Sequence, residues 1–261
     1  MKRVIYQIIL FILLIAESKS QTPYSTWELG FYGGESYYLG ELNQNHFIPF
    51  NISFGPRLRY NYDQRIGVKG LLTYSKISGD DTNSRNSFNE DRNFSFESGL
   101  FESAFVGEFN FKSYSPLDPK STSGTPFLFL GLGYVRHNPK TKIDGNLVNT
   151  SDLQTEGVSF NKNIFSIPFG IGYKLRSNKF SFEFSWGIRK TSSDYLDDVS
   201  TNFANSLQEN EDNSQTDKSN STQYENVSNI KRGDRYNKDW YVFTGLTIFV
   251  NLTREEVCRK I

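Results

Sequence analysis

The feature that most constrains this chain is an alternation of apolar and polar residues that recurs in one segment after another. In KFSFEFSWGIR, residues 179–189, four aromatic residues and an isoleucine occupy every second position, and Ser, Glu, Gly and Arg residues stand between them. Successive side chains of a β-strand point to opposite faces, so this pattern predicts a strand with one apolar and one polar face. No segment after residue 20 shows a comparable helical periodicity, and we expect an all-β fold.

Eight segments share this alternation and together predict an eight-stranded antiparallel transmembrane β-barrel. They cover approximately residues 26–36, 47–61, 65–77, 94–112, 126–137, 162–175, 179–191 and 239–250. Outer-membrane barrels have short periplasmic turns and long external loops. The connections are sorted in the same way, with short turns at 61–65 and 176–178 and long polar segments near 37–46, 78–93, 138–161 and 192–238. The segment 115–126 is an exception, because it is long where a short turn is expected.

The N-terminus has the pattern of a secretory signal peptide. Lys2 and Arg3 precede the apolar segment VIYQIILFILLIA, and small residues stand at positions 18 and 20. This order of basic, apolar and small residues predicts export from the cytoplasm, with an N-terminal anchor helix as the alternative. We therefore assign residues 1–20 to the signal peptide, 21–250 to the barrel with 192–238 as its long polar external loop, and 251–261 to a periplasmic C-terminal tail.

The composition indicates what the two faces of the strands meet. Aromatic residues make up 16% of the chain, although its mean hydropathy is −0.55, so many aromatic side chains must contact something other than water. In a membrane barrel they would face lipid, and the polar residues would line the lumen. In a soluble sandwich or lipocalin-like barrel they would form the core. The signal peptide and the even strand count favour the membrane barrel, in the outer membrane.

Aromatic residues near the ends of the predicted strands suit the two membrane–water interfaces. They are Trp27, Tyr60, Tyr62, Tyr74, Trp186, Trp240 and Tyr241. The final run, DWYVFTGLTIFV, is apolar on both faces, so its pattern leaves its orientation open. Formal charges balance at 29 basic and 29 acidic residues, which gives no indication of nucleic acid as a partner.

The polar faces of the predicted strands carry both signs of charge. The residues expected to point inward include Glu28, Glu102, Glu108, Glu183, Arg57, Arg59, Lys69, Lys174 and Arg189. Interior side chains just fill a barrel of about eight strands, and buried charges are costly unless they are paired. We therefore expect an ion-paired plug, with a proton or ion path as the alternative.

The residue types that carry enzyme chemistry are sparse. His46 and His137 are the only histidines and Cys258 is the only cysteine. The sequence therefore contains no motif for a zinc cluster or for a catalytic Cys/His pair. No serine nucleophile elbow is visible. The sequence predicts a protein that is not an enzyme and that has no cofactor and no metal ion.

The segment KTSSDYLDDVSTNF contains three aspartates around one tyrosine, namely Asp194, Asp197, Asp198 and Tyr195. Their spacing does not match the alternating ligands of an EF-hand loop. Aspartates of a solvated loop commonly bond to nearby backbone amides, and we expect these residues to stabilise the loop or contact a partner. Calcium binding and a general acid/base pair remain as alternatives.

Cys258 lies in the predicted periplasmic tail, NLTREEVCRKI. A lone thiol in an oxidising compartment favours an intermolecular disulfide or a free reactive group. The alternative is an unpaired thiol without a role.

Five blocks of sequence carry a resemblance to a known family. They are WELGFYGGESYYLGELN (27–43), TPFLFLGLGYVRHNPK (125–140), TEGVSFNKNIFSIPFGIGYK (155–174), SSDYLDDVS (192–200) and RGDRYNKDWYVFTGLTI (232–248). In this order they resemble the PorG-like outer-membrane barrel family of Bacteroidota. That family usually has Thr at the position of Ser193, and the hydroxyl is kept here.

The resemblance implies a structural and anchoring component of the type IX secretion system, which exports proteins and in gliding bacteria also serves motility. It implies outer-membrane lipid and a periplasmic ring of a PorK-like lipoprotein and a PorN-like protein as partners. The turn 115–126 and the tail with Cys258 would dock this ring. A stand-alone OmpA-like barrel, which supports the envelope or binds external ligands, is the second interpretation.

Overall fold

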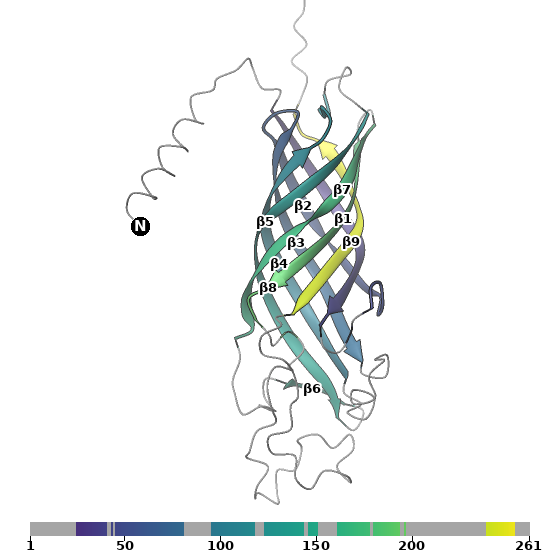
Figure 1. Ribbon diagram of the computed structural model, residues 1–261, viewed down its shortest axis with the longest axis vertical. Coiled ribbons are helices and arrows are strands. Elements are labelled where there is room, and N and C mark those ends of the chain that lie inside the picture. Colours follow the sequence, from purple (N-terminus) through teal and green to yellow (C-terminus); the bar gives the residue numbers. More distant parts are fainter. Residues whose placement is uncertain are drawn as a thin grey trace, which may run out of the picture.

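The protein is an antiparallel β-barrel in a computed structural model that describes residues 25–40, 43, 45–80, 95–117, 123–143, 146–150, 161–177, 180–193, 196 and 239–253 (Figure 1). The strands are β1 (Thr26–Leu39), β2 (Asn51–Asn61), β3 (Ile66–Asp80), β4 (Ser95–Asn110), β5 (Gly124–Ile143), β6 (Asn146–Asn149), β7 (Asn163–Arg176), β8 (Phe180–Thr191) and β9 (Trp240–Asn251). Among these described residues, no helix is long and apolar enough to cross a membrane.

Eight of the strands close into a single barrel, as the alternation predicts. Each pairs with its neighbour in the chain, β5 pairs with β7, and the pairing of β1 with β9 closes the sheet. The short strand β6 pairs only with the end of β5 and lies beyond the barrel wall (Figure 1). Closure gives every barrel strand two partners, so no edge with unpaired backbone groups is left.

Two predicted boundaries differ from the structure by more than three residues, for different reasons. The second strand begins at Asn51 and not at residue 47, because Phe47 has a φ of 65°, which an extended strand does not allow. The segment 138–161 is not all loop, since β5 continues to Ile143 and forms a hairpin with β6. Because the hairpin lies beyond the apolar part of the wall, its sequence shows no regular alternation of apolar and polar residues.

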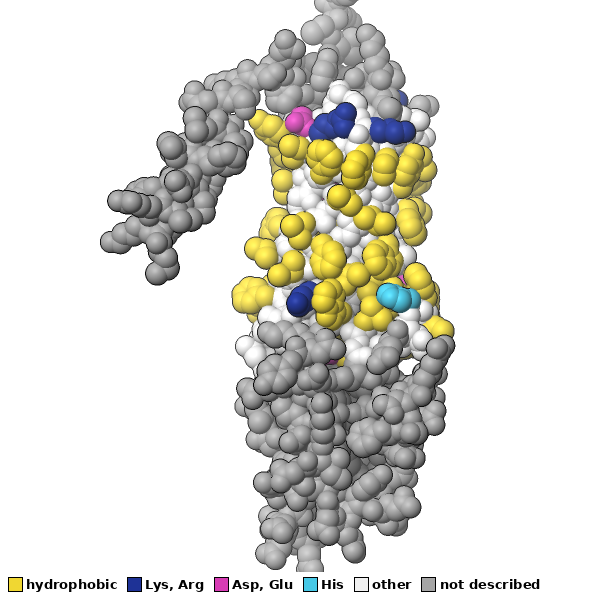
Figure 2. All heavy atoms as spheres, in the orientation of Figure 1, with side chains coloured by type: hydrophobic (Ala, Val, Ile, Leu, Met, Phe, Trp, Pro, Cys, Tyr) yellow, Lys and Arg dark blue, Asp and Glu magenta, His cyan; other side chains and the backbone are white. Residues whose placement is uncertain are grey.

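The outer face of the barrel is apolar, as predicted. Phe101, Phe105 and Phe109 of β4 are 46–70% exposed, whereas Glu102 and Glu108 between them are buried. Figure 2 shows hydrophobic side chains over the visible wall, with Lys and Arg at one end and a cation and a histidine near the other. Because this surface is far larger than the patches that water-soluble monomers expose, it requires an apolar environment.

The orientation of the final strand, which the sequence leaves open, is decided by the closed sheet. Leu246, Ile248 and Val250 of β9 point outward, and Phe243 and Phe249 point into the lumen. Tyr241 is also fully buried in the lumen. The expectation that Tyr241 lies at the membrane interface is therefore wrong, because its position in β9 alternates with the outward residues.

Glycines on the inward face make room for these inward rings. A Cβ atom at Gly30 would lie 2.5 Å from Cδ1 of Phe249, and one at Gly172 or Gly187 would overlap the ring of Phe127 or Phe129. An interior as densely packed as that of a protein core does not absorb such an overlap without movement. Small and large side chains thus alternate around the lumen.

We predict that Gly30→Ala lowers the free energy of unfolding by about 1–3 kcal/mol, since the added methyl group overpacks the lumen against Phe249. The measurement is urea unfolding of the barrel refolded in phospholipid vesicles. Gly33→Ala is the matched control on the same strand, because its Cβ would meet no atom within 4 Å. In a Phe249→Ala background the cost of Gly30→Ala should shrink, and an unchanged cost would contradict this packing.

Candidate functional site

Among the residues that the structure describes, charged side chains gather in the lumen. Among the described residues, five acids and five bases are buried there or at its mouth, which are Glu28, Glu102, Glu108, Glu183, Asp239, Arg57, Arg59, Lys69, Lys174 and Arg189. The nine residues that the alternation places inward are all in this set. The formal charges of these ten residues cancel, so the interior has no net charge to attract an ion of either sign.

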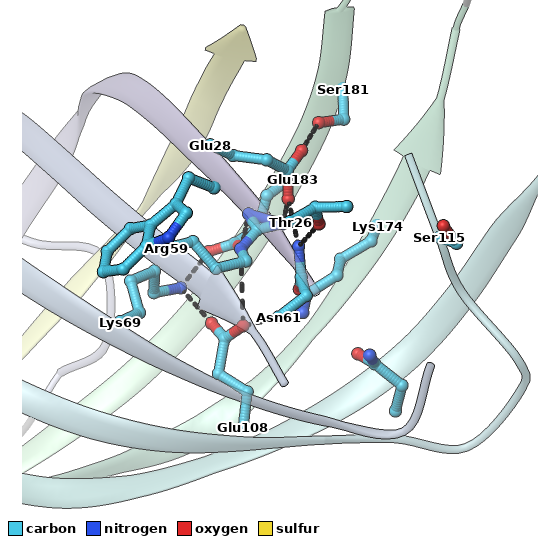
Figure 3. A network of polar contacts seen from close by, with 12 residues as sticks. Thr26, Glu28, Arg59, Asn61, Lys69, Glu108, Ser115, Lys174, Ser181 and Glu183 are labelled. Atoms are coloured by element: carbon cyan, nitrogen blue, oxygen red, sulfur yellow. Dashed lines mark hydrogen bonds and ion pairs between the residues drawn. The ribbon is translucent and has the colours of Figure 1, made fainter. Parts of the chain in front are cut away.

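Arg59 is the centre of the first group of ion pairs (Figure 3). Its guanidinium group lies 3.2 Å from Glu28, 3.4 Å from Glu108 and 2.7 Å from Glu183, and all four side chains are buried. Four strands supply them, since Glu28 is on β1, Arg59 on β2, Glu108 on β4 and Glu183 on β8. A planar guanidinium with five N–H donors is suited to several carboxylates at once.

Two lysines complete this group. Lys69 Nζ lies 2.5 Å from both Glu108 and Glu183, and Lys174 Nζ lies 2.6 Å from Glu108. Three carboxylates thus face three cations in a cluster that crosses the lumen (Figure 3). The neutral partners Asn61 and Ser181 donate further hydrogen bonds to Glu28. Removing charges from water is costly, and this cost is offset only where each charge has close partners of the opposite sign.

Inward aromatic rings cover the sides of these cations that no carboxylate contacts. The guanidinium carbon of Arg59 lies 3.8 Å from the ring centroid of Phe249, and Lys174 Nζ lies 4.7 Å from that of Phe127. A cation over an aromatic face is attracted by the ring quadrupole, and more strongly where water is absent. The rings therefore fill space and stabilise the charges at the same time.

A second, smaller group lies further along the lumen. Arg189 is 3.5 Å from Glu102, and the hydroxyl of Tyr241 donates to the same carboxylate. Arg57 donates to the carbonyl oxygen of Leu72 at 2.6 Å and to the hydroxyl of Thr73 at 3.0 Å. With the cluster around Arg59, this group places buried charged side chains in two successive parts of the lumen.

Tyr114 closes the end of the lumen where the turn after β4 begins. Its ring is fully buried, and Lys174 Nζ lies 5.5 Å from the ring centroid. The Tyr114 amide donates to the carbonyl oxygen of Gln64 at 3.0 Å, which holds this turn against the turn after β2. Burial raises the pKa of the Tyr114 phenol to about 12, and the Glu28 carboxylate makes a smaller contribution in the same direction. The hydroxyl therefore stays protonated.

Leu196 closes the opposite end. It is fully buried and packs in an apolar cluster with residues that include Tyr38, Phe96 and Ile164. The Asp239 carboxylate holds it there, because one oxygen accepts from the Leu196 amide at 2.9 Å and the other accepts from the Tyr38 hydroxyl at 2.7 Å. Leu196 belongs to the block SSDYLDDVS, so this block contributes the side chain that enters the mouth.

The acidic and thiol residues singled out in the sequence are not among the residues that the structure describes. They are Asp194, Tyr195, Asp197, Asp198 and Cys258. Their roles therefore stay predictions, although Leu196 and Ser193 of the same block are placed. Within the described part of the chain, no group of three or more His, Cys, Asp or Glu residues could hold a metal ion.

The residues that sequence reasoning missed are the inward aromatic rings and Leu196. Phe127 and Phe129 stand in the run TPFLFLGLG, where leucines occupy the outward positions, so no polar residue marks the inner face. The glycines of β7 and β8 that face these rings are a signal that could have found them, because each large inward side chain requires a small one opposite.

These features define a class of protein, a closed eight-stranded barrel with an apolar outer face and a filled lumen. The chain belongs to the family described as a domain of unknown function, DUF6089, which matches residues 2–210. No curated protein matches the chain.

Several solved structures have similar folds at low sequence identity. Neisserial surface protein A is 9% identical, with a TM-score of 0.41 and coverage of 87% of this chain and 97% of that one. Ail of Yersinia pestis, in complex with the heparin analogue sucrose octasulfate, is 10% identical with a TM-score of 0.40, and the coverage is again 87% and 97%. The outer membrane protein OprG from Pseudomonas aeruginosa is 8% identical with a TM-score of 0.40 and the same coverage. The fold assignment rests on the closed topology of this chain itself.

We predict that Arg59→Met lowers the free energy of unfolding by about 3–5 kcal/mol, because three buried carboxylates lose their shared cation. Urea unfolding in phospholipid vesicles measures the change. Lys76→Met is the control, since Lys76 pairs with Glu97 in an exposed position and such pairs contribute about 0–1 kcal/mol. Equal effects of the two substitutions would show that the lumen network is not a source of stability.

We also predict that the purified protein inserted into planar lipid bilayers produces no conductance steps, because side chains and ion pairs fill the lumen between Tyr114 and Leu196. A general porin inserted under the same conditions serves as the positive control. Insertion is verified separately by protease protection in vesicles. Regular conductance steps from verified, inserted protein would mean that the lumen opens.

Proposed function

We propose that this protein is a structural barrel of the bacterial outer membrane that anchors other proteins and is neither a channel nor an enzyme. The observation that carries the proposal is the lumen, which is filled by paired charges and closed by Tyr114 and Leu196. A barrel without a path through it acts through its surfaces and loops. Its role then depends on what binds at its two ends.

The outer wall supports the membrane location. Its exposed side chains are mainly Phe, Leu, Ile, Val and Tyr, which is the outward band expected of a transmembrane barrel. Aromatic pairs stand at the ends of strands, such as Trp27 with Tyr60, whose ring centroids are 4.7 Å apart. Amphipathic rings of this kind prefer the level of the lipid head groups.

The finer assignment, to type IX secretion, is supported by the resemblance to the PorG-like family. In this proposal the periplasmic end of the barrel docks a ring of a PorK-like lipoprotein and a PorN-like protein. The turn after β4 is suited to docking because its ends are fixed. The Lys112 amide donates to the Thr125 hydroxyl at 2.9 Å, and Tyr114 anchors the turn to Gln64.

A stand-alone OmpA-like barrel that binds external ligands is the second candidate. The hairpin of β5 and β6 favours it, because its four paired positions, from Lys140 with Asn149 to Ile143 with Asn146, extend the wall beyond the apolar band. A wall extension of this kind would present residues to the exterior.

We predict that deletion of the gene leaves type IX cargo inside the cells, because the periplasmic ring loses its anchor in the outer membrane. The measurement compares cargo in the medium and in the cell fraction for the deletion strain and the complemented strain. Unchanged secretion, with the protein confirmed in the outer-membrane fraction of the parent strain, would overturn the secretion role and favour the stand-alone barrel.

The same strains test the docking contact. Affinity purification of the full-length protein should recover the PorK-like and PorN-like partners. Non-reducing electrophoresis of the wild type beside Cys258→Ser then tests the tail. A heavier, reducible species that is absent from the variant indicates a disulfide to a partner, and its absence from both restricts docking to noncovalent contacts.

A further inference from the structure

A groove of about 820 Å³ lies on the outer face of the barrel, over β4, β5, β7, β8 and β9. Its apolar lining comes from outward side chains, which are Phe105, Leu132, Tyr134, Phe165, Ile167 and Trp240. It is a hollow in a wall that would otherwise meet lipid. A flexible molecule must fill such a hollow, because the side chains that line an empty one lose van der Waals contacts on that side.

An interruption of the β5–β7 ladder lies beside the hollow. The register runs from Gly124–Leu175 to Leu130–Phe169 and resumes at Gly133–Ser166, so two positions of the ladder are skipped. Pro168 lies in the skipped stretch and has no N–H to donate. The small residues Ser103 and Gly133 also line the groove, so no large side chain fills it from within.

The groove has a cation at one end. Lys190 lines it, is exposed, and has its ammonium group 5.4 Å from the ring centroid of Trp240. Lys190 is the next-to-last residue of β8, and Trp240 is the first residue of β9. Both therefore stand at the rim where these strands meet the external segments, whereas Phe105 lies well inside β4. None of the residues that line the groove is acidic.

This arrangement matches one kind of molecule, a lipid with a negatively charged head group. The apolar side chains suit an acyl chain, and a basic residue at the membrane surface attracts an anionic lipid. Arg136, an exposed residue of β5 two positions beyond Tyr134, adds a second positive charge at this end. A protein segment would instead require partners for its backbone polar groups, whereas most of the exposed surface of the groove is apolar.

We infer that this groove binds an outer-leaflet lipid whose phosphate head group carries a net negative charge, with an acyl chain along Leu132 and Ile167 and the phosphate at Lys190. The inference rests on the proposed outer-membrane location and extends it from a general lipid contact to one defined binding site. The occupied groove would complete the apolar surface of the wall at the place where the β5–β7 ladder is interrupted.

The test is lipid binding to the purified full-length barrel in detergent, followed by native mass spectrometry. The probes are phosphatidylglycerol and phosphatidylcholine with identical acyl chains, and inorganic phosphate. We expect the wild type to prefer phosphatidylglycerol, and Lys190→Gln to weaken that binding about fivefold, the effect of one basic residue at an anionic lipid surface. Lys112→Gln, at an exposed position of the opposite end, is the matched control and should bind as the wild type does.

A second variant tests the apolar part separately. Ser103→Trp fills the groove and should weaken binding of both lipids, while leaving the barrel folded as judged by heat-modifiable migration in electrophoresis. Equal binding of the two lipids, or no loss in Lys190→Gln, would overturn the inference. Binding of inorganic phosphate that depends on Lys190 and excludes lipid would also overturn it, in favour of a free anion. Failure of the proposed function is a distinct result, since it would appear as absence from the outer-membrane fraction.

Discussion

The structure depends on the pairing of charges inside the barrel. An apolar outer wall leaves the inner face to the polar residues, and an eight-stranded barrel is too narrow to keep those residues in water. Arg59 resolves this constraint by contacting Glu28, Glu108 and Glu183 from one position. Because these carboxylates come from three other strands, the ion pairs also tie distant parts of the wall together. The need to pair buried charges thus accounts for contacts that join strands far apart around the wall.

The inward aromatic rings are the second part of the same solution. Charged side chains alone cannot fill a lumen to the density of a protein interior. Phe249 packs on Arg59 and opposite Gly30, so one ring covers a cation and occupies the space that a glycine leaves. Tyr114 and Leu196 complete the filling at the two ends. Charges and rings thus share the filling of the described lumen.

Much of this fold follows from the sequence, because the alternation of residues reports directly on which face is apolar. The eight barrel strands and the nine inward charges are confirmed. The orientation of β9 was not predictable, since Tyr241 and Phe243 are as apolar as the outward residues beside them. The β5–β6 hairpin was missed because backbone pairing beyond the apolar band has no hydrophobic period to detect. Leu196 was not predictable, since a single leucine among polar loop residues has no periodicity that indicates burial.

The sequence by itself therefore determined the class of fold, the two faces of most strands and the presence of charges that must be paired. Only the tertiary structure decided which charges pair, which rings cover them and which loop residue enters the mouth. The reason is that these contacts join residues far apart in the chain, such as Arg59 and Glu183 at a separation of 124 positions. Local periodicity specifies the direction of a side chain, whereas its partner is set by the register of strands that meet only when the barrel closes.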